Sequence, residues 1–130
     1  MNLRSEQMEV LHELELSPYV AELGATLRSR FPDLLGALPS EAMDARVVGG
    51  MRRAFGYGLV GFSDVARYLN LEVIYGPSLE RGEPWMRRML RDASVGSPRR
   101  RLDRLVAACV QWLRMQEASA TARHSYGGRQ

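Results

Sequence analysis

The sequence has no lysine, a single cysteine and no long hydrophobic run. All eighteen basic residues are arginine, for which a GC-rich coding sequence is a sufficient cause. One cysteine, Cys109, excludes an internal disulfide, so the chain does not require an oxidising compartment. Uninterrupted apolar runs extend over a few residues, whereas a membrane-spanning helix needs roughly 20. Because the N-terminus also lacks the apolar core of a signal peptide, we expect a cytoplasmic protein without a membrane segment.

Histidine is scarce as well, which leaves few candidates for metal binding or acid–base catalysis. The two histidines are His12, in an acidic segment near Glu9, and His124, close to the C-terminus. A lone histidine beside scattered carboxylates is more typical of a solvated helix face than of a metal site. Cys109 falls on an apolar stripe, where a small buried hydrophobic residue is the usual finding. With so few partners for a nucleophile, we expect no enzyme activity, no metal and no cofactor.

Alternating strand patterns are absent too, whereas helix signals recur along the chain. At 130 residues the chain has the length of one domain with a core of its own. We therefore predict an all-α fold, a compact bundle of about five or six short helices joined by short loops. The domain is expected to cover residues 1–117. Residues 118–130 are small, polar and glycine-rich and lack an apolar period, which is typical of a disordered tail.

Serine caps, prolines and apolar spacing place the helices. A helix ends before Pro32 and another at Gly76-Pro77, because proline cannot continue a helix and disfavours it in the residue before. In the first helix, Met8, Leu11 and Leu14 recur at three-residue steps. The expected helices cover about 5–15, 18–31, 40–55, 63–75 and 98–116, with a further short helix from Pro84.

The third and fourth of these helices differ in how their apolar residues are distributed. The helix over 40–55 has one apolar face at four-residue steps, formed by Met43, Val47, Met51 and Phe55. Its arginines fall elsewhere and are expected in solvent, namely Arg46, Arg52 and Arg53. The helix over 63–75 is apolar nearly all round, which is typical of a helix in the middle of a bundle.

Three glycines between these two helices have the spacing G-x-G-x-x-G, at Gly56, Gly58 and Gly61. That spacing is the phosphate-binding fingerprint of dinucleotide-binding proteins, but it functions only after a buried strand in a βαβ unit. Here the preceding segment has a helix period. We therefore interpret the glycines as a corner, in which Gly56 or Gly58 ends one helix in the left-handed conformation and Gly61 and Ser63 begin the next.

Charge is unevenly distributed, and this allows a second class of function. Residues 1–24 carry a net charge of −4 and the remainder +7. Arginines gather around Trp85 and at the start of the last helix, which is compatible with nucleic-acid contact. Acidic residues interleave with them and no helix-turn-helix pattern is evident. The clustered arginines are Arg87, Arg88, Arg91, Arg99, Arg100, Arg101 and Arg104.

The segment over 76–86 is the most suggestive of a binding surface. It reads GPSLERGEPWM, in which an aromatic residue and a methionine follow a turn rich in proline and glycine. Loops held by rigid helices often bind partners. Together with the exposed arginines, it gives the candidate partner contacts, which are Pro77, Leu79, Trp85, Met86, Arg87, Arg88, Arg99, Arg100 and Arg101.

Several segments together carry a family resemblance over roughly residues 3–113. They are LRSEQM, LRSRFP, RRAFGYGLVGFSDVARYLNLEVIYGP, PWMRRML and RLDRL, in this order. The order and spacing resemble a family of small, uncharacterised helical proteins of Gram-negative bacteria. Its members carry the pattern ERA-x-x-YGI-x-S/T-E-x-DVARY/FIDLM, then a GP-D-F loop, PW and RLDRL. The chain departs from this pattern in GLVGFSDV, which lacks the acid after YGI-x-S, and at Ser78-Leu79, which replace an acidic–aromatic pair.

The resemblance implies a biological setting more than a mechanism. Such proteins are often encoded beside components and cargo of type VI secretion machinery or beside polymorphic toxins. This implies an accessory protein, either a chaperone or adaptor for a secreted effector or an immunity protein for a toxin. No functional residue of the family carries over. Our leading hypothesis is a non-catalytic protein-interaction module that binds such a partner, and the alternative is a small arginine-rich nucleic-acid-binding protein.

Overall fold

The computed structural model describes the backbone of residues 18–127 and the side chains as far as residue 121. All regular elements in this range are helices, which confirms the prediction of an all-α fold. The chain divides into two compact units at Glu83 and Pro84, where the sequence predicts one domain over 1–117. The helix expected at 5–15 lies outside the described residues. No helix within 18–127 has the length and apolar character needed to cross a membrane.

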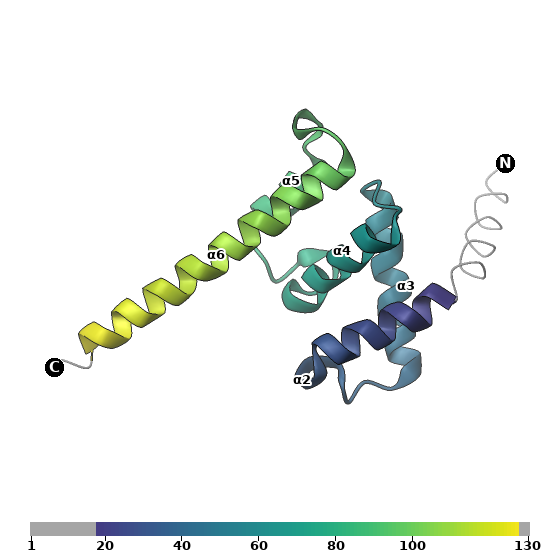
Figure 1. Cartoon of the computed structure of the whole chain (residues 1–130), viewed down its shortest axis with the longest axis horizontal. Helices are drawn as coiled ribbons and strands as arrows, with labels where there is room; N and C mark the ends of the chain where they lie inside the picture. Colours follow the sequence, from purple (N-terminus) through teal and green to yellow (C-terminus); the bar gives the residue numbers. More distant parts are fainter. Residues whose placement is uncertain (1–17, 128–130) are drawn as a thin grey trace. The chain divides into compact units, whose positions relative to one another are not determined.

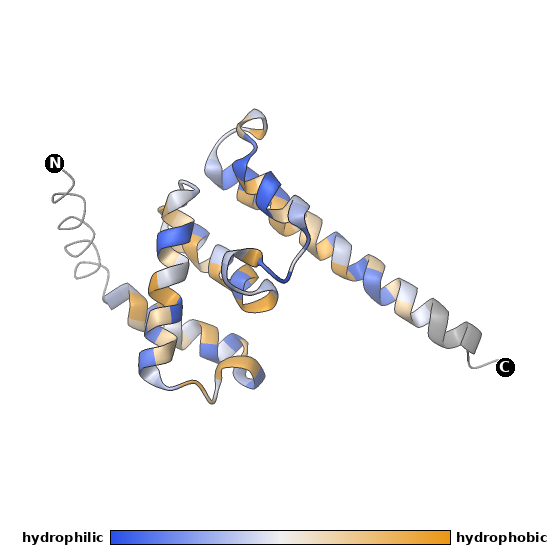
Figure 2. Cartoon of the chain, turned by 180° about the vertical axis from the view of Figure 1, so that it is seen from behind, coloured by the Kyte–Doolittle hydropathy of each residue, from blue (hydrophilic) through white to orange (hydrophobic). Residues whose placement is uncertain are grey.

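The first unit contains a helix over residues 18–30 followed by four further elements. These are α2 (Pro32–Leu35), α3 (Ser40–Gly56), α4 (Phe62–Tyr75) and the 3-10 helix η1 (Pro77–Leu79). α3 packs against α4, and η1 packs against both. The helix over 18–30 crosses α3 (Figure 1), and Gly24 on it faces the side chain of Met43. Hydrophobic residues recur along each helix with polar ones between them, as expected for helices with one buried face (Figure 2).

Pro32 ends the helix over 18–30, as the sequence predicts. The helix stops at residue 30, and Pro32 then begins the single turn of α2. The guanidinium of Arg28 holds the following bend by donating hydrogen bonds to the carbonyl oxygens of Gly36 and Leu38, at 3.2 and 2.5 Å. These bonds satisfy carbonyl oxygens at the end of α2 and in the bend that follows it.

The core of the first unit confirms the predicted faces of α3 and α4. On α3 the buried residues are Met43, Val47, Gly50, Met51 and Ala54, whereas Phe55 is half-buried. On α4 they include Val65, Tyr68, Leu69, Leu71 and Val73, on several sides of the helix. α4 therefore lies in the middle of this unit, with α3 and η1 against it.

The three glycines form the expected corner between α3 and α4. Gly58 has a φ of 84°, the left-handed conformation that favours glycine, and it follows the end of α3. The next residue, Leu59, turns back into the core and donates its backbone N–H to the carbonyl oxygen of Ala54 at 2.9 Å. One detail of the prediction is wrong. Gly61 is the N-cap of α4 and Ser63 lies within the first turn, so Ser63 does not cap the helix.

The second unit is a hairpin of two helices. It consists of α5 (Pro84–Arg91), the 3-10 helix η2 (Ala93–Val95) and α6 (Pro98–Gly127). The two helices run antiparallel, since Trp85 at the start of α5 lies beside Trp112 and Leu90 near its end bonds to Arg101. α5 packs against α6, and the buried residues of the two helices are Met86, Leu90, Leu102, Leu105 and Cys109. Cys109 is thus a buried apolar residue, as predicted.

α6 is longer than the sequence indicates. It continues to Gly127, whereas the apolar period predicts an end near residue 116 and a disordered tail from 118. The reason is that ASATAR has no glycine or proline and contains alanine, the strongest helix former, at every second position. Loss of the apolar period therefore marks the end of the buried stripe and not the end of the helix.

Candidate protein-binding site

The α5–α6 hairpin has a closed end, where a short turn joins the two helices, and an open end, where α5 begins. Arg101 holds the turn at the closed end. Its guanidinium donates to the carbonyl oxygens of Leu90 and Gly96, both at 3.0 Å. In the turn between the helices, the hydroxyl and the backbone N–H of Ser94 donate to the Asp92 carboxylate. These bonds hold the pKa of Asp92 below its usual value. The turn is therefore set by its own polar contacts.

The open end of the hairpin presents two tryptophans. The rings of Trp85 and Trp112 lie 6.3 Å apart at 72°, an edge-to-face arrangement that aromatic pairs prefer. Beside them is a hollow of about 250 Å³, lined by this pair together with Ala108, Gln111 and Met115. Trp85 and Trp112 are each only half-buried. The pair thus forms one wall of an open, mainly apolar depression.

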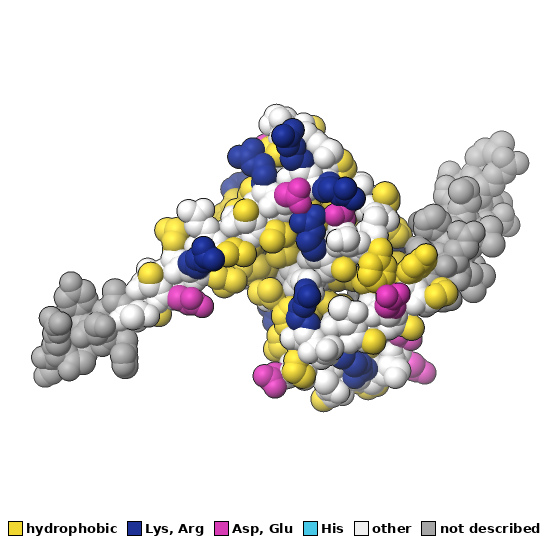
Figure 3. All heavy atoms as spheres, in the orientation of Figure 1, with side chains coloured by type: hydrophobic (Ala, Val, Ile, Leu, Met, Phe, Trp, Pro, Cys, Tyr) yellow, Lys and Arg dark blue, Asp and Glu magenta, His cyan; other side chains and the backbone are white. Residues whose placement is uncertain are grey.

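Further apolar side chains are exposed on α6 near Trp112, on more than one side of the helix. Met115 is 59% exposed, and Val110 and Leu113 are each 43% exposed. Within this unit α5 covers only part of α6, because a helix of eight residues is about 12 Å long and one of thirty about 45 Å. In Figure 3, hydrophobic side chains lie along α6 between its arginine-rich start and its far half. The hollow and the residues that line it, Trp85, Ala108, Gln111, Trp112 and Met115, are called the tryptophan surface below.

The predicted contact residues divide between the two units and between surface and core. Pro77 and Leu79 belong to the first unit, and the other seven belong to the second. Leu79 and Met86 are buried, at 1% and 0% exposure, so they offer no surface to a partner. Pro77 is exposed and Trp85 is half-buried. Of the residues predicted in the segment 76–86, Trp85 is therefore the one that the tryptophan surface includes.

The predicted arginines differ in their exposure and in their hydrogen bonds. Arg88, Arg99 and Arg100 are exposed, Arg87 is half-buried, and Arg101 is used by the closed end of the hairpin. Acidic side chains lie among the arginines in this part of the molecule (Figure 3). The exposed arginines therefore do not make an unbroken positive surface.

A second cluster of polar side chains lies inside the first unit, around Glu72. This residue is buried in the apolar helix α4, at 3% exposure. Arg53 donates two hydrogen bonds to its carboxylate, from Nε to Oε2 at 2.6 Å and from Nη2 to Oε1 at 2.8 Å. The hydroxyl of Tyr68 and the backbone N–H of Ser78 also donate to Oε2, at 2.5 and 3.1 Å. A buried carboxylate with this many donors is a satisfied ion pair.

The Glu72 cluster corrects the expectation of solvated arginines on α3 for Arg46 and Arg53, whereas Arg52 is exposed as predicted. Arg53 is paired with Glu72, and its pKa is raised by the hydrogen bonds that it donates there. Arg46 also approaches the backbone carbonyl oxygen of Glu72, at 3.5 Å. Burial, together with the bond to Glu72, raises the pKa of Tyr68 far above its usual value. The phenol therefore stays protonated and acts as a donor.

The Glu72 cluster also fixes the backbone of η1. Ser78 and Leu79 both have a φ of 57°, a left-handed conformation that is uncommon for residues other than glycine. The bond from the Ser78 N–H to Glu72 and the burial of Leu79 hold them there. The cluster thus joins α3, α4 and η1. All four hydrogen bonds to the carboxylate serve this structural role.

No group of three or more histidine, cysteine, aspartate or glutamate side chains in the described part of the chain is placed to hold a metal ion. Nor does the chain match any protein-family model, curated protein or solved structure. The function is therefore argued from the tryptophan surface.

Sequence reasoning missed two features of these clusters. Met115 follows Trp112 by three residues and so lies one turn further along the same side, but it is not among the contacts that the sequence predicts. Glu72 stands between Leu71 and Val73 in the most apolar helix. A carboxylate in that position requires a cation partner, and this was the available signal for its pairing.

Proposed function

We propose that this chain is a protein-interaction module that binds another protein through the tryptophan surface and has no catalytic role. The observation that supports this is the exposure of Met115 beside a half-buried tryptophan pair and a hollow of about 250 Å³. A single exposed apolar side chain is ordinary, but adjacent ones around a depression are typical of interaction sites.

The residue types favour a protein partner. Tryptophan, methionine and arginine are enriched in protein interfaces, and tryptophan and arginine carry much of the binding energy measured in them. Arg88 is exposed and follows Trp85 by three residues on α5, so it lies next to it on the helix surface. Arg114, beside Met115 on α6, is exposed as well. An apolar centre with guanidinium groups at its edge matches the general pattern of such interfaces.

The family resemblance supports a more specific partner. It favours a secreted effector or toxin encoded by an adjacent gene, bound in the cytoplasm by a chaperone, an adaptor or an immunity protein. These roles differ in one observation, since an immunity protein blocks the activity of its partner and a chaperone or adaptor aids its delivery.

The experiment is co-expression of the tagged chain with the product of each adjacent gene, followed by co-purification and affinity measurement. Met115→Asp places a carboxylate at the hollow, and Thr121→Asp places the same group on an exposed position of the same helix away from it. We expect Met115→Asp to weaken binding about thirty-fold, the effect of losing about 2 kcal/mol at an interface centre, and Thr121→Asp to leave it unchanged. Equal affinity for both variants, or no partner at all, contradicts the proposal.

Nucleic-acid binding remains the alternative, because Arg88, Arg99 and Arg100 are exposed. It predicts binding to DNA at low salt that weakens steeply as salt is added. The involvement of Arg101 in the hairpin turn and the interleaved acids favour the protein partner. Salt-dependent DNA binding that is lost in Arg99→Ala/Arg100→Ala, together with no protein partner, supports the alternative.

A further inference from the structure

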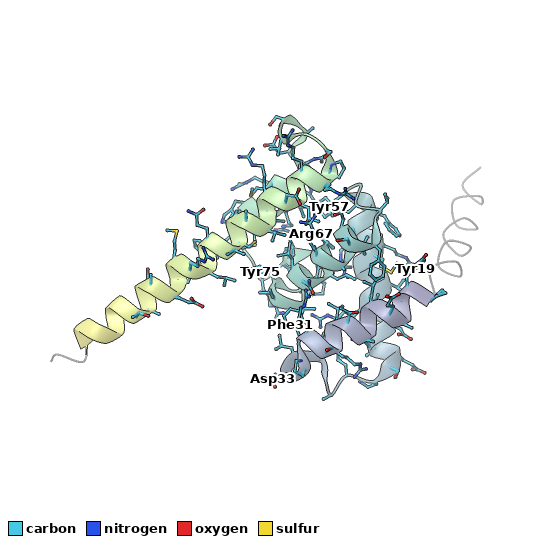
Figure 4. The ribbon with its side chains drawn as sticks, viewed as in Figure 1. Tyr19, Phe31, Asp33, Tyr57, Arg67 and Tyr75 are labelled. Atoms are coloured by element: carbon cyan, nitrogen blue, oxygen red, sulfur yellow. The ribbon has the colours of Figure 1, made fainter. Side chains whose placement is uncertain are left out.

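The first unit has an apolar groove of its own next to the helix corner. It has a volume of about 290 Å³, and its lining includes Tyr19, Leu23, Met51, Phe55, Val60 and Phe62. The rings of Tyr19 and Phe62 lie 5.9 Å apart at one side of it. Hydrophobic side chains are visible in Figure 3 at the place where Figure 4 labels Tyr19.

Much of this lining is exposed. Val60 is 76% exposed, Tyr19 46% and Phe62 42%. Val60 and Phe62 flank Gly61, so the corner that ends α3 and begins α4 also presents them at the surface. Three large apolar side chains exposed around one groove favour a covering segment, because contiguous exposed apolar surface is uncommon on a protein without a partner for it.

The position of Tyr19 indicates which segment covers the groove. It is the second residue of the described helix, and seventeen residues precede Pro18 in the chain. The sequence of this segment predicts a helix over 5–15 with Met8, Leu11 and Leu14 along one side, and a break at Ser17-Pro18. Two residues between helices is a usual length for an antiparallel helical hairpin.

We propose that residues 5–15 fold back as a helix over the groove, with Met8, Leu11 and Leu14 directed into it. The geometry of a hairpin supports this pairing. A connection at residues 16–17 puts Leu14 opposite Tyr19, and Leu11 opposite position 22, next to Leu23 at the buried floor of the groove. The segment is about 16 Å long as a helix, enough to pass along the first three turns of its neighbour. Its glutamates, such as Glu9 and Glu13, then face solvent.

Cysteine cross-linking in the full chain tests the proposal. The only native cysteine, Cys109, is buried and can be replaced by alanine. In that background, Val60→Cys is combined with one cysteine at a time over positions 7 to 15, and disulfide formation is followed in a glutathione buffer at low protein concentration. Circular dichroism of each variant checks that the helix content is kept.

The expected result is a rate of intramolecular disulfide formation that rises and falls with the helix period. It is highest at positions 8, 11 and 14 and at least ten-fold lower at the matched positions 9 and 13 on the opposite side. Equal rates at all positions, or a maximum at 9 and 13, overturn the proposal. Cross-links only between molecules, at a rate that increases with protein concentration, overturn it in favour of a second copy of the chain as the occupant.

Discussion

The ion pair between Arg53 and Glu72 gives a quantitative test of how the first unit is held together. Arg53→Met removes the guanidinium but keeps a long apolar side chain, and it takes away two of the four hydrogen bonds on a carboxylate that is 3% exposed. Removing one partner of a buried pair costs roughly 3–5 kcal/mol. Because the Arg53 side chain is 31% exposed, water partly compensates, and we expect the lower end, about 3 kcal/mol.

The same substitution should lower the free energy of unfolding far less in a variant that lacks the Glu72 carboxylate. In a Glu72→Met background, Arg53→Met is expected to cost less than about 1 kcal/mol, which gives a coupling energy of about 2 kcal/mol. The assay is urea unfolding followed by far-ultraviolet circular dichroism, on the wild type, both single variants and the double variant, with the m-values compared. Effects that add within about 0.5 kcal/mol refute the assignment of Arg53 as the partner that compensates the buried charge.

Three further predictions concern the backbone and the phenol of the same unit. Gly58→Ala should lower the free energy of unfolding by about 1 kcal/mol, because Gly58 has a φ of 84° that other residues rarely adopt. Gly56→Ala should be neutral or stabilising, because a Cβ at this position of α3 would meet no other atom. Equal effects of the two substitutions in thermal unfolding contradict this. Gly50→Ala should lower the free energy of unfolding by about 1–3 kcal/mol, because its Cβ would meet the buried side chain of Leu69 and lie 3.0 Å from a carboxylate oxygen of Glu72. Gly49→Ala, next to it, should not destabilise the unit. Denaturant titration of both variants tests this difference, and equal effects would contradict it. Because the pKa of Tyr68 is raised, the unfolded chain loses the phenol proton near pH 10 while the folded chain keeps it, so the free energy of unfolding falls as the pH rises above 10. Tyr68→Phe should make this fall with pH less steep. The same dependence on pH in the variant and the wild type, measured by unfolding at several alkaline pH values, would contradict the prediction.

The elements of the fold follow from local sequence. Pro32 ends a helix and Gly58 ends α3, as the sequence predicts, because both act through the backbone of one or two residues. The apolar period also identifies the buried faces of α3 and α4. Such signals are local, so they need no knowledge of how the helices pack.

Features that depend on two distant segments were not predicted. The pairing of Arg53 with Glu72 joins residues nineteen positions apart on two helices, and no spacing rule within one helix reveals it. The burial of Leu79 and Met86 has the same origin, since it depends on which segments pack over them once the chain is folded. The length of α6 was missed because its last part is helical by propensity without an apolar face.

The central claim is that the tryptophan surface binds a protein partner. Amide hydrogen exchange tests it most directly, measured on the chain alone and in complex with the adjacent-gene product that co-purifies with it. We predict slower exchange on binding in residues 108–115 of α6 and around Trp85, with little change elsewhere in α6. Slower exchange confined to other parts of the chain, or no adjacent-gene product that binds, would contradict the claim.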